Sequence, residues 1–413
     1  MKTQPSTIPL RYVLTPVERT GFETSQVLSV YRDHGVVPKN SRSDNYNKTP
    51  TDLSRYQLVQ AGDLVVNKMK AWQGSLGVSD HEGIVSPDYL VCEIGGQVHP
   101  PYLHHLLRSA PIIGDFKSRS KGIRPAQWRL YWDDLAQVRI DLPLLEEQRR
   151  IAEFLDAETI RIDRVLELRS ELAARLIERD NALRDGLLDR LFESTDTIPL
   201  RRFITRIEQG DSPQCEAVPR QTSTEWGILK LSSVRHGQFD PDENKRLPDH
   251  LRPNRSYSVG HGDFLVTRAN TPNLVGDVAV VTEGVERLLL PDLIYRVRLT
   301  DSVSADFVAQ VALGRRTRSL IESVARGTSQ SMVKLRGEDI KTWPIPSATK
   351  DQQDKFVSII AHRTAASARL RSLVDRQAKL LAERRQALIT AAVTGQFDVS
   401  AASGRNVTEG VSA

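Results

Sequence analysis

The chain has 413 residues, too many for a single hydrophobic core, so two or three domains are expected. Its content of 39% hydrophobic and 26% charged residues is ordinary for a soluble globular protein. No apolar run approaches the roughly 18 residues of a membrane span, and the N-terminus has no apolar segment typical of a secretory signal. With only two distant cysteines, we expect a cytoplasmic protein without a disulfide framework or a membrane partner. The net charge of +5 is compatible with nucleic-acid binding but does not demonstrate it.

The first part of the chain has the pattern of a mixed α and β domain. The valine-rich segment Asp63 to Lys68 and the segment Tyr89 to Ile94 predict strands. Tyr102 to Ser109 predicts a helix, and Lys117 to Arg129 is a basic stretch in which glycine and proline predict a loop.

A long helix is predicted to follow. Apolar residues recur there at steps of three, four or seven and form one narrow stripe, while Glu, Arg and Asp occupy the other faces. Some forty residues of helix would be roughly 60 Å long. A stripe this narrow suits a single partner helix better than a globular core.

The partner is a second copy of the same pattern. Gln148 corresponds to Gln353, and Phe192 to Phe397, with a constant difference of 205 positions along the helix. The domains repeat as well, because Ile198 to Arg201 repeats Ile8 to Arg11, and Gly262-Asp263 repeats Gly62-Asp63. The chain is therefore an internal duplication.

The second helix has clearer ends than the first. Thr349 and Gln352 fit a capping box, and Gly395 suits a left-handed residue that ends the helix. The predicted fold class is α+β, with two duplicated α/β domains separated by two long helices that form an antiparallel coiled coil. The predicted boundaries are 1–141 and 195–345 for the domains, 142–194 and 346–398 for the helices, and 399–413 for a small, polar, disordered tail.

Common catalytic motifs are absent from the sequence. It contains no GxxxxGK[ST] phosphate loop, no GxSxG or HExxH motif, and no clustered Cys/His spacing for a metal. It also lacks the [DN]PP[YF] tetrapeptide that amino-methyltransferases use and a glycine-rich cofactor fingerprint. We therefore expect a chain that is not an enzyme and holds no cofactor or metal of its own.

Two features have a plain structural interpretation. His104 and His105 point about 100° apart on a helix, so an exposed pair is favoured over a metal site. Trp72 could stack on a base, but a position in the domain core is favoured.

Basic segments recur at equivalent places in both domains, and this recurrence favours DNA contact over an ordinary solvated face. The second segment adds short hydrogen-bonding side chains of the sort that read base edges. The predicted DNA-binding residues are Lys68, Lys70, Lys117, Arg119, Lys121, Arg124, Arg268, Asn270, Arg326, Ser329, Gln330 and Lys334.

These features together resemble the DNA-specificity subunit of type I restriction–modification enzymes. The resemblance rests on the repeat arrangement, on Leu142-Pro143 with Glu147-Gln148, Ile151 and Phe154-Leu155, and on the ending Leu388-Ile-Thr-Ala-Ala-Val-Thr-Gly395. It spans nearly the entire chain. The second repeat has Asp351-Gln352-Gln353 where the first has Glu146-Glu147-Gln148, so one acidic position is lost.

The resemblance implies that each domain recognises one half of a split, asymmetric double-stranded DNA site, while the helices fix the spacer. It also implies two methyltransferase subunits that use S-adenosylmethionine, and motor–nuclease subunits that use ATP with Mg²⁺. The predicted subunit and coiled-coil interface consists of Gln148, Ile151, Leu155, Ile162, Leu172, Leu176, Leu183, Gln353, Phe356, Ile360, Leu370, Leu373, Leu380 and Leu388.

Two alternatives remain open at this stage. One is a coiled-coil scaffold that joins protein partners without sequence-specific DNA binding. The other is a fused nuclease whose acidic residues are scattered through the sequence. A salt-sensitive, sequence-selective affinity for DNA would argue against the scaffold, and metal-dependent cleavage by the chain alone would favour the nuclease.

Overall fold

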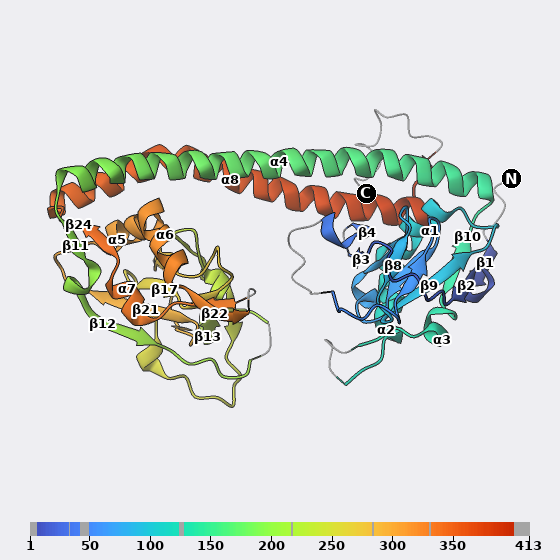
Figure 1. Cartoon of the computed structure of the whole chain (residues 1–413), viewed down its shortest axis with the longest axis horizontal. Coiled ribbons are helices and arrows are strands. Elements are labelled where there is room, and N and C mark those ends of the chain that lie inside the picture. Colours follow the sequence, from blue (N-terminus) through green and yellow to red (C-terminus); the bar gives the residue numbers. More distant parts are fainter. Residues whose placement is uncertain are drawn as a thin grey trace. The chain divides into compact units, whose positions relative to one another are not determined.

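The computed structural model describes residues 6–32, 34–41, 49–123, 128–215, 218–282, 285–329 and 332–399. The chain forms two compact units, and the division between them runs through both long helices (Figure 1). Unit 1 contains residues 1–171 and 374–413, and unit 2 contains residues 172–373. The boundaries predicted from the sequence separate the domains from the long helices, which is a different division from these two units, and they remain predictions. None of the described helices is both long and apolar enough to cross a membrane.

Unit 1 is built around a four-stranded antiparallel sheet in the order β2-β9-β6-β7. Its central strand β6 is buried along its whole length, because both faces of the sheet are covered. Leu64 and Val66 face the cluster that contains α1, and Val65 faces the cluster built on the hairpin β3–β4. The strands of this sheet are β2 (Leu14–Val17), β6 (Leu64–Asn67), β7 (Leu76–Val78) and β9 (Tyr89–Ile94).

The remaining elements of unit 1 cover this sheet. β1 pairs with β10, β3 with β4, and β5 with β8, all antiparallel. These strands are β1 (Ser6–Pro9), β3 (Leu28–Tyr31), β4 (Gly35–Pro38), β5 (Gln57–Val59), β8 (Gly83–Val85) and β10 (Arg139–Leu142). The short helices are η1 (Leu10–Tyr12), η2 (Lys39–Ser41), η3 (Ala71–Gln73), α1 (Pro100–Leu107), α2 (Ala110–Arg119) and α3 (Trp132–Leu135).

Unit 2 repeats this plan with its own antiparallel sheet, in the order β12-β21-β17-β19. Phe264 and Val266 on the central strand face the cluster of α5, and Leu265 faces a second cluster on the opposite side. The sheet strands are β12 (Ile204–Gln209), β17 (Phe264–Thr267), β19 (Val278–Val280) and β21 (Ile294–Leu299). The duplication read from the sequence is thus a duplication of sheet topology.

The surrounding elements of unit 2 include the pair β11 (Thr197–Pro199) and β24 (Pro344–Pro346). The other strands are β13 (Gly227–Leu229), β14 (Val234–Arg235), β15 (Gln238–Phe239), β16 (Asn244–Arg246), β18 (Ala269–Asn270), β20 (Leu288–Leu289), β22 (Arg326–Ser329) and β23 (Met332–Lys334). The short helices are η5 (Leu200–Arg202), η6 (Leu231–Ser233), η7 (Arg255–Tyr257), α5 (Ala305–Leu313), α6 (Arg315–Val324) and α7 (Gly337–Lys341).

The two long helices are α4 (Leu145–Ser194) and α8 (Lys350–Val393). The predicted capping box of α8 is confirmed, since Thr349 Oγ1 accepts the Gln352 N–H at 3.4 Å and Gln352 Oε1 accepts the Thr349 N–H at 2.8 Å. Gly395 follows the helix with a φ of 71°, as the sequence predicts.

The helices pack against each other within each unit. In unit 1, Asp163 binds Arg385 and Arg169 binds Gln377, so residue numbers rise along α4 while they fall along the facing stretch of α8. In unit 2, Asp180 binds both Ser367 and Arg371. The segments of α4 and α8 in unit 1 are therefore antiparallel, as the sequence predicts.

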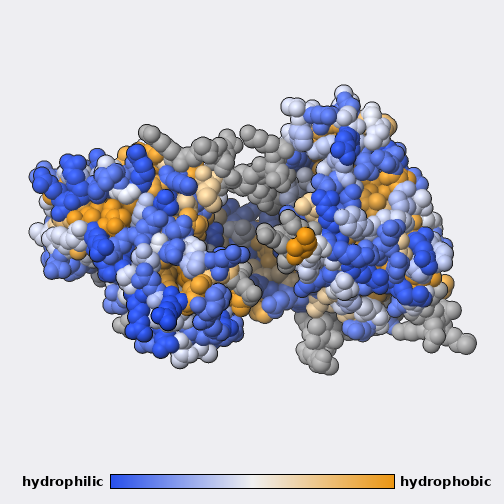
Figure 2. Space-filling model, turned by 90° about the horizontal axis from the view of Figure 1, so that it is seen from below, coloured by the Kyte–Doolittle hydropathy of each residue, from blue (hydrophilic) through white to orange (hydrophobic). Residues whose placement is uncertain are grey.

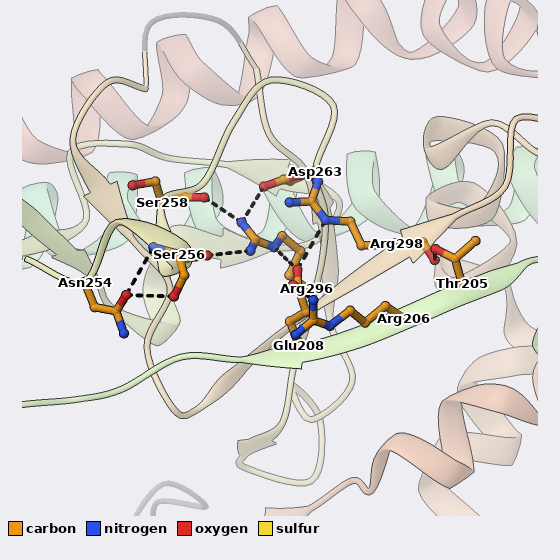
Figure 3. Close-up of polar contacts among 9 residues, drawn as sticks. All are labelled: Thr205, Arg206, Glu208, Asn254, Ser256, Ser258, Asp263, Arg296 and Arg298. Carbon is orange, nitrogen blue, oxygen red and sulfur yellow. Dashed lines mark hydrogen bonds and ion pairs between the residues drawn. The ribbon is translucent and has the colours of Figure 1, made fainter.

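A buried aspartate at the start of each central strand anchors each sheet. Asp263 in unit 2 pairs with Arg296 at 3.2 Å and Arg298 at 2.5 Å, and both arginines also pair with Glu208 on β12 (Figure 3). The Arg296 guanidinium is almost fully buried and donates two further bonds to backbone carbonyls, at 2.5 Å to Ser258 and 3.0 Å to Ser256. This cluster ties the 254–263 segment to the sheet.

Candidate nucleic-acid interface

Most of the predicted DNA-binding residues of unit 2 come together in one small sheet. Strand β23 pairs with β18 on one side and with β22 on the other, in the order β18-β23-β22. Lys334 lies opposite both Ala269 and Arg326, and Asn270 lies opposite Val333. Positions up to 65 residues apart in the sequence therefore form one continuous basic hairpin surface.

The side chains on this surface differ in availability. Lys334 is exposed and has no side-chain partner among the described residues. Arg268 donates to the Asp292 carbonyl at 3.4 Å, and Asn270 Oδ1 accepts the Thr271 N–H at 2.9 Å. Arg326 and Ser329 lie on β22, and Gln330 falls outside the described residues.

Unit 1 carries a corresponding hairpin attached in the same way. Lys121 and Arg129 form an antiparallel bridge, and the Leu130 N–H donates to the Lys68 carbonyl at 2.8 Å. In unit 2, Leu335 donates to the Arg268 carbonyl at the same distance. Lys117 and Arg119 belong to the last turn of α2, which corrects the loop expected for the whole stretch Lys117 to Arg129. The basic hairpin of unit 1 begins at the Lys121–Arg129 bridge and is fixed to the segment after the central strand.

The predicted DNA-binding lysines and arginines of unit 1 differ in how far their side chains are already engaged. Lys70 and Lys117 are exposed without a side-chain partner among the described residues. Arg119 pairs with Asp115 and Lys121 with Asp134, both at 2.8 Å. Lys68 donates to the Pro87 carbonyl at 2.8 Å, and burial lowers its pKa, so it is the weakest of these candidates. Arg124 lies outside the described residues.

Trp72 does not belong to the domain core, contrary to the interpretation favoured by the sequence. It is partly buried and stacks edge-on against Trp128 of the basic hairpin, with ring centroids 5.4 Å apart. Its Nε1–H donates to the Met69 carbonyl at 3.1 Å. Trp128 is not among the residues predicted from the sequence, although its position inside the basic stretch between Lys117 and Arg129 is a signal for it. Ile123, at 97% exposure, also stands on this hairpin.

His104 and His105 are not an exposed pair, which corrects the sequence-based expectation. His105 is buried and its Nε2 lies 2.7 Å from Asp156 on α4. His104 Nδ1 accepts the Val78 N–H at 3.2 Å, and burial together with the nearby Arg108 holds the pKa of His104 well below its usual value. Both rings therefore hold α1 against its neighbours. Among the described residues no group of three or more metal-ligating side chains occurs.

The predicted helix interface divides into a buried part and an exposed part. Leu183 is partly buried against the core of unit 2. Leu172, Leu370, Leu373 and Leu380 are instead 40–57% exposed, so packing between α4 and α8 does not bury them. A single partner helix covers only a narrow face of a long helix. The buried residues are Ile151, Leu155, Ile162, Leu176, Phe356, Ile360 and Leu388.

The side chains of Gln148 and Gln353 form hydrogen bonds with residues outside the facing helix. Gln148 Oε1 accepts the His99 N–H at 2.8 Å, and its Nε2 donates to the carbonyls of Gln97 and Pro143. Gln353 makes the same three bonds with the residues 205 positions later, which are Ser304, Ser302 and Ala348. Each glutamine therefore fixes the start of its long helix to the segment before α1 or α5.

The visible surface of both units is mostly hydrophilic, with smaller hydrophobic areas interspersed (Figure 2). The arrangement offers basic hairpins, flanking aromatic rings and free lysines, which suit a phosphate backbone and base edges. It offers no arrangement of acid, base and nucleophile that resembles a catalytic site among the residues discussed above.

Comparisons with known proteins agree with this arrangement. The chain is 31% identical over 159 residues to the EcoEI type I restriction enzyme specificity subunit of Escherichia coli, a match that covers 38% of this chain and 27% of that protein. It is 21% identical over 429 residues to the EcoKI specificity subunit of Escherichia coli strain K12, covering 94% of this chain and 88% of that protein. No family model matches.

A solved structure has a similar fold. It concerns complex assembly and conformational transition of the type I restriction–modification system, and the match has a TM-score of 0.53 at 17% identity. The match covers 95% of this chain and 98% of that one. At this identity the likeness supports the fold alone.

Proposed function

We propose that this chain is a specificity subunit of a type I restriction enzyme, like the two relatives it resembles, and that it directs its partner subunits to a split DNA site. Each unit recognises one half of an asymmetric double-stranded sequence, and the helix pair sets the spacer. The chain itself catalyses nothing. It acts in the cytoplasm, where its partners find DNA.

The observation that carries this proposal is one sheet topology that bears two different basic hairpins. Both hairpins join the central sheet by the same backbone bond, Leu130 to Lys68 in unit 1 and Leu335 to Arg268 in unit 2. Their side chains differ, as recognition of two different half-sites requires. In this proposal the lysines hold phosphates and a few polar side chains identify the bases.

The exposed leucines of α4 and α8 supply the second element of the proposal. Leu172, Leu370 and Leu373 stand on the helices of unit 2 with 40–45% of their area exposed. Apolar side chains left open on a helix pair suit helices of another subunit. Two methyltransferase subunits would dock on the helical regions and modify adenine with S-adenosylmethionine. Motor–nuclease subunits, which use ATP and Mg²⁺, would then cleave unmodified DNA.

Dimensions are consistent with this arrangement. Half-sites on one face of DNA lie about one helical turn, roughly 34 Å, apart. The 50 residues of α4 correspond to roughly 75 Å of helix, long enough to set such a spacing.

Genome-wide mapping of N6-methyladenine tests the proposal directly. Cells with and without this chain are compared while the methyltransferase partner is expressed and active. We expect a split motif that disappears when the chain is deleted, and a change in one half only when residues 1–141 are exchanged for those of another specificity subunit. A motif that persists without the chain contradicts the proposal and favours the protein scaffold.

Salt dependence separates DNA binding from the scaffold alternative. DNA affinity should fall by about 0.9 log units per log unit of salt for each phosphate contacted. A scaffold would bind its protein partners with little dependence on salt and would show no preference among DNA sequences.

A further inference from the structure

A small hairpin in unit 2 remains outside the surfaces described so far. Strands β14 and β15 are joined by the two-residue turn His236-Gly237, and both turn residues have positive φ, 51° and 80°. These angles are those of a type I′ turn, whose twist matches that of a two-stranded ribbon. A positive φ is uncommon for residues other than glycine, and backbone of this kind tends to cluster at functional positions.

The two faces of this ribbon have opposite character. Val234 lies opposite Phe239, Val234 is buried, and both pack in the cluster of Leu265 and Ala279. Arg235 lies opposite Gln238. Directly opposed residues share a face, and successive residues alternate, so Arg235 and Gln238 project together from the outer face. Both are exposed, and neither has a side-chain partner among the described residues.

Hydrogen bonds and close packing fix the backbone of this turn on its inner side. The His236 N–H donates to Asp277 Oδ2 at 2.7 Å, and the Gly237 N–H donates to the Val278 carbonyl at 3.0 Å. A Cβ on Gly237 would lie 2.6 Å from Leu313 Cδ1, so the backbone rests directly against α5. Asp277 is buried and also accepts the Val278 N–H at 2.9 Å. The outer face is thus presented by a fixed backbone.

The ribbon is also linked to the basic hairpin surface. Asp277, which anchors the turn, ends the segment that begins after Asn270 of β18. Arg318 braces this segment by donating to the carbonyls of Val275 at 2.9 Å and Asn273 at 3.3 Å. The ribbon and the basic hairpin are therefore connected through the segment between Asn270 and Asp277, which Arg318 holds in place.

We infer that Arg235 and Gln238 read base edges in the half-site recognised by unit 2. The inference rests on the proposed function and adds two specificity-determining residues to it. A two-stranded ribbon fits the major groove, where arginine pairs in bidentate fashion with guanine and glutamine with adenine. A rigid backbone favours such contacts because little side-chain and backbone freedom is lost on binding.

The corresponding hairpin of unit 1 provides an internal contrast. Its tip also contains an arginine, a histidine and a glycine, namely Arg32, His34 and Gly35, and Gly35 has a φ of 68°. Next to its tip it pairs Tyr31 with Gly35, and the following pair is Val30 with Val36, whose side chains are both buried. Unit 1 therefore lacks an exposed Arg–Gln pair on this hairpin, and the inference concerns unit 2 alone.

The test uses the full chain expressed with its methyltransferase partner. Arg235→Ala and Gln238→Ala are each compared with Arg202→Ala, an exposed arginine on η5. Methylation mapping should show that each ribbon variant relaxes one base in the unit 2 half-site, while the unit 1 half-site and the spacer stay unchanged. Affinity for the native site should fall by about tenfold to a hundredfold. Arg202→Ala should leave the motif intact.

Arg235→Lys separates base reading from charge. A lysine keeps a phosphate contact but lacks the planar fork that pairs with guanine, so specificity should stay relaxed. The inference is overturned if the motif is unchanged in Arg235→Ala and Gln238→Ala, or if Arg235→Lys restores both affinity and motif. A wild-type chain that directs no motif removes the proposed function, and this inference with it, which is a distinct outcome.

Discussion

The two units keep one buried aspartate but pair it with charges from different strands. In unit 1, Arg19 beyond β2 binds Asp63 and Glu93, both at 2.6 Å. In unit 2 the arginines stand on the neighbouring strand, at positions 296 and 298, and the additional carboxylate is Glu208 on β12. Glu93 and Arg298 occupy equivalent positions with opposite charge.

This difference shows which parts of a duplicated domain can change independently. The backbone plan has stayed constant because the sheet order and the helix anchors depend on it. The charge at the position of Glu93 and Arg298, by contrast, can change sign only if the buried aspartate still pairs with an arginine, since an unpaired buried charge is costly. A chimaera that joins strands from both units would break these pairings.

The largest expected effect comes from removing the buried arginine of unit 2. Arg296→Met leaves Asp263 and Glu208 without their buried counter-ion, and the expected loss of stability is about 3–5 kcal/mol. Arg19→Met in unit 1 should cost less, because the Arg19 side chain is 19% exposed against 3% for Arg296. Denaturant unfolding of both variants measures the contrast, and equal losses would contradict it.

Replacing the glutamine that anchors each long helix should cause a smaller loss of stability, and the loss should be equal in the two units. Gln148→Ala and Gln353→Ala each leave one partly buried N–H and two carbonyls without this partner, at a cost of about 1–3 kcal/mol. Because the three bonds are the same in both units, the two losses should agree closely. Thermal unfolding with separate probes in each unit tests this. A loss in only one unit would show that the same three hydrogen bonds contribute differently to the stability of the two units.

Replacing the residue before each long helix by alanine should cost about 1 kcal/mol more stability at α8 than at α4. Thr349→Ala removes the hydroxyl that caps α8 and should destabilise unit 2 by about 0.5–2 kcal/mol. The equivalent residue before α4, Leu144, has no capping side chain and is 66% exposed, so Leu144→Ala serves as the control with little expected effect. A Thr349→Ala variant as stable as wild type would contradict the role of the cap.

The smallest contrast near neutral pH concerns His104. Burial and Arg108 depress its folded-state pKa below the usual 6.5, so the unfolded chain binds a proton that the folded chain does not. Stability of unit 1 should therefore fall as pH decreases below about 6.5, and His104→Gln should weaken this dependence. Ala309 stands at the equivalent position in unit 2, which should lack this contribution. Unfolding free energies between pH 7 and 5 provide the measurement.

The sequence alone established the duplication, both long helices and the strands at the centre of each sheet. These features are local or periodic, so the chain itself carries the signal: the stripe along α4, the constant difference of 205 positions, and the capping box at Thr349. The recurrence of basic segments was visible for the same reason. The family resemblance followed from this order of elements.

Only the tertiary structure decided which of these residues are free to act. Lys68 is occupied by the Pro87 carbonyl, Trp72 stacks on Trp128, and Leu380 stays open on its helix. Such outcomes depend on partners that lie far away in sequence, and no local pattern encodes them. The face shared by Arg235 and Gln238 likewise exists only because a two-residue turn places them opposite each other, over an apolar face that the core has already buried.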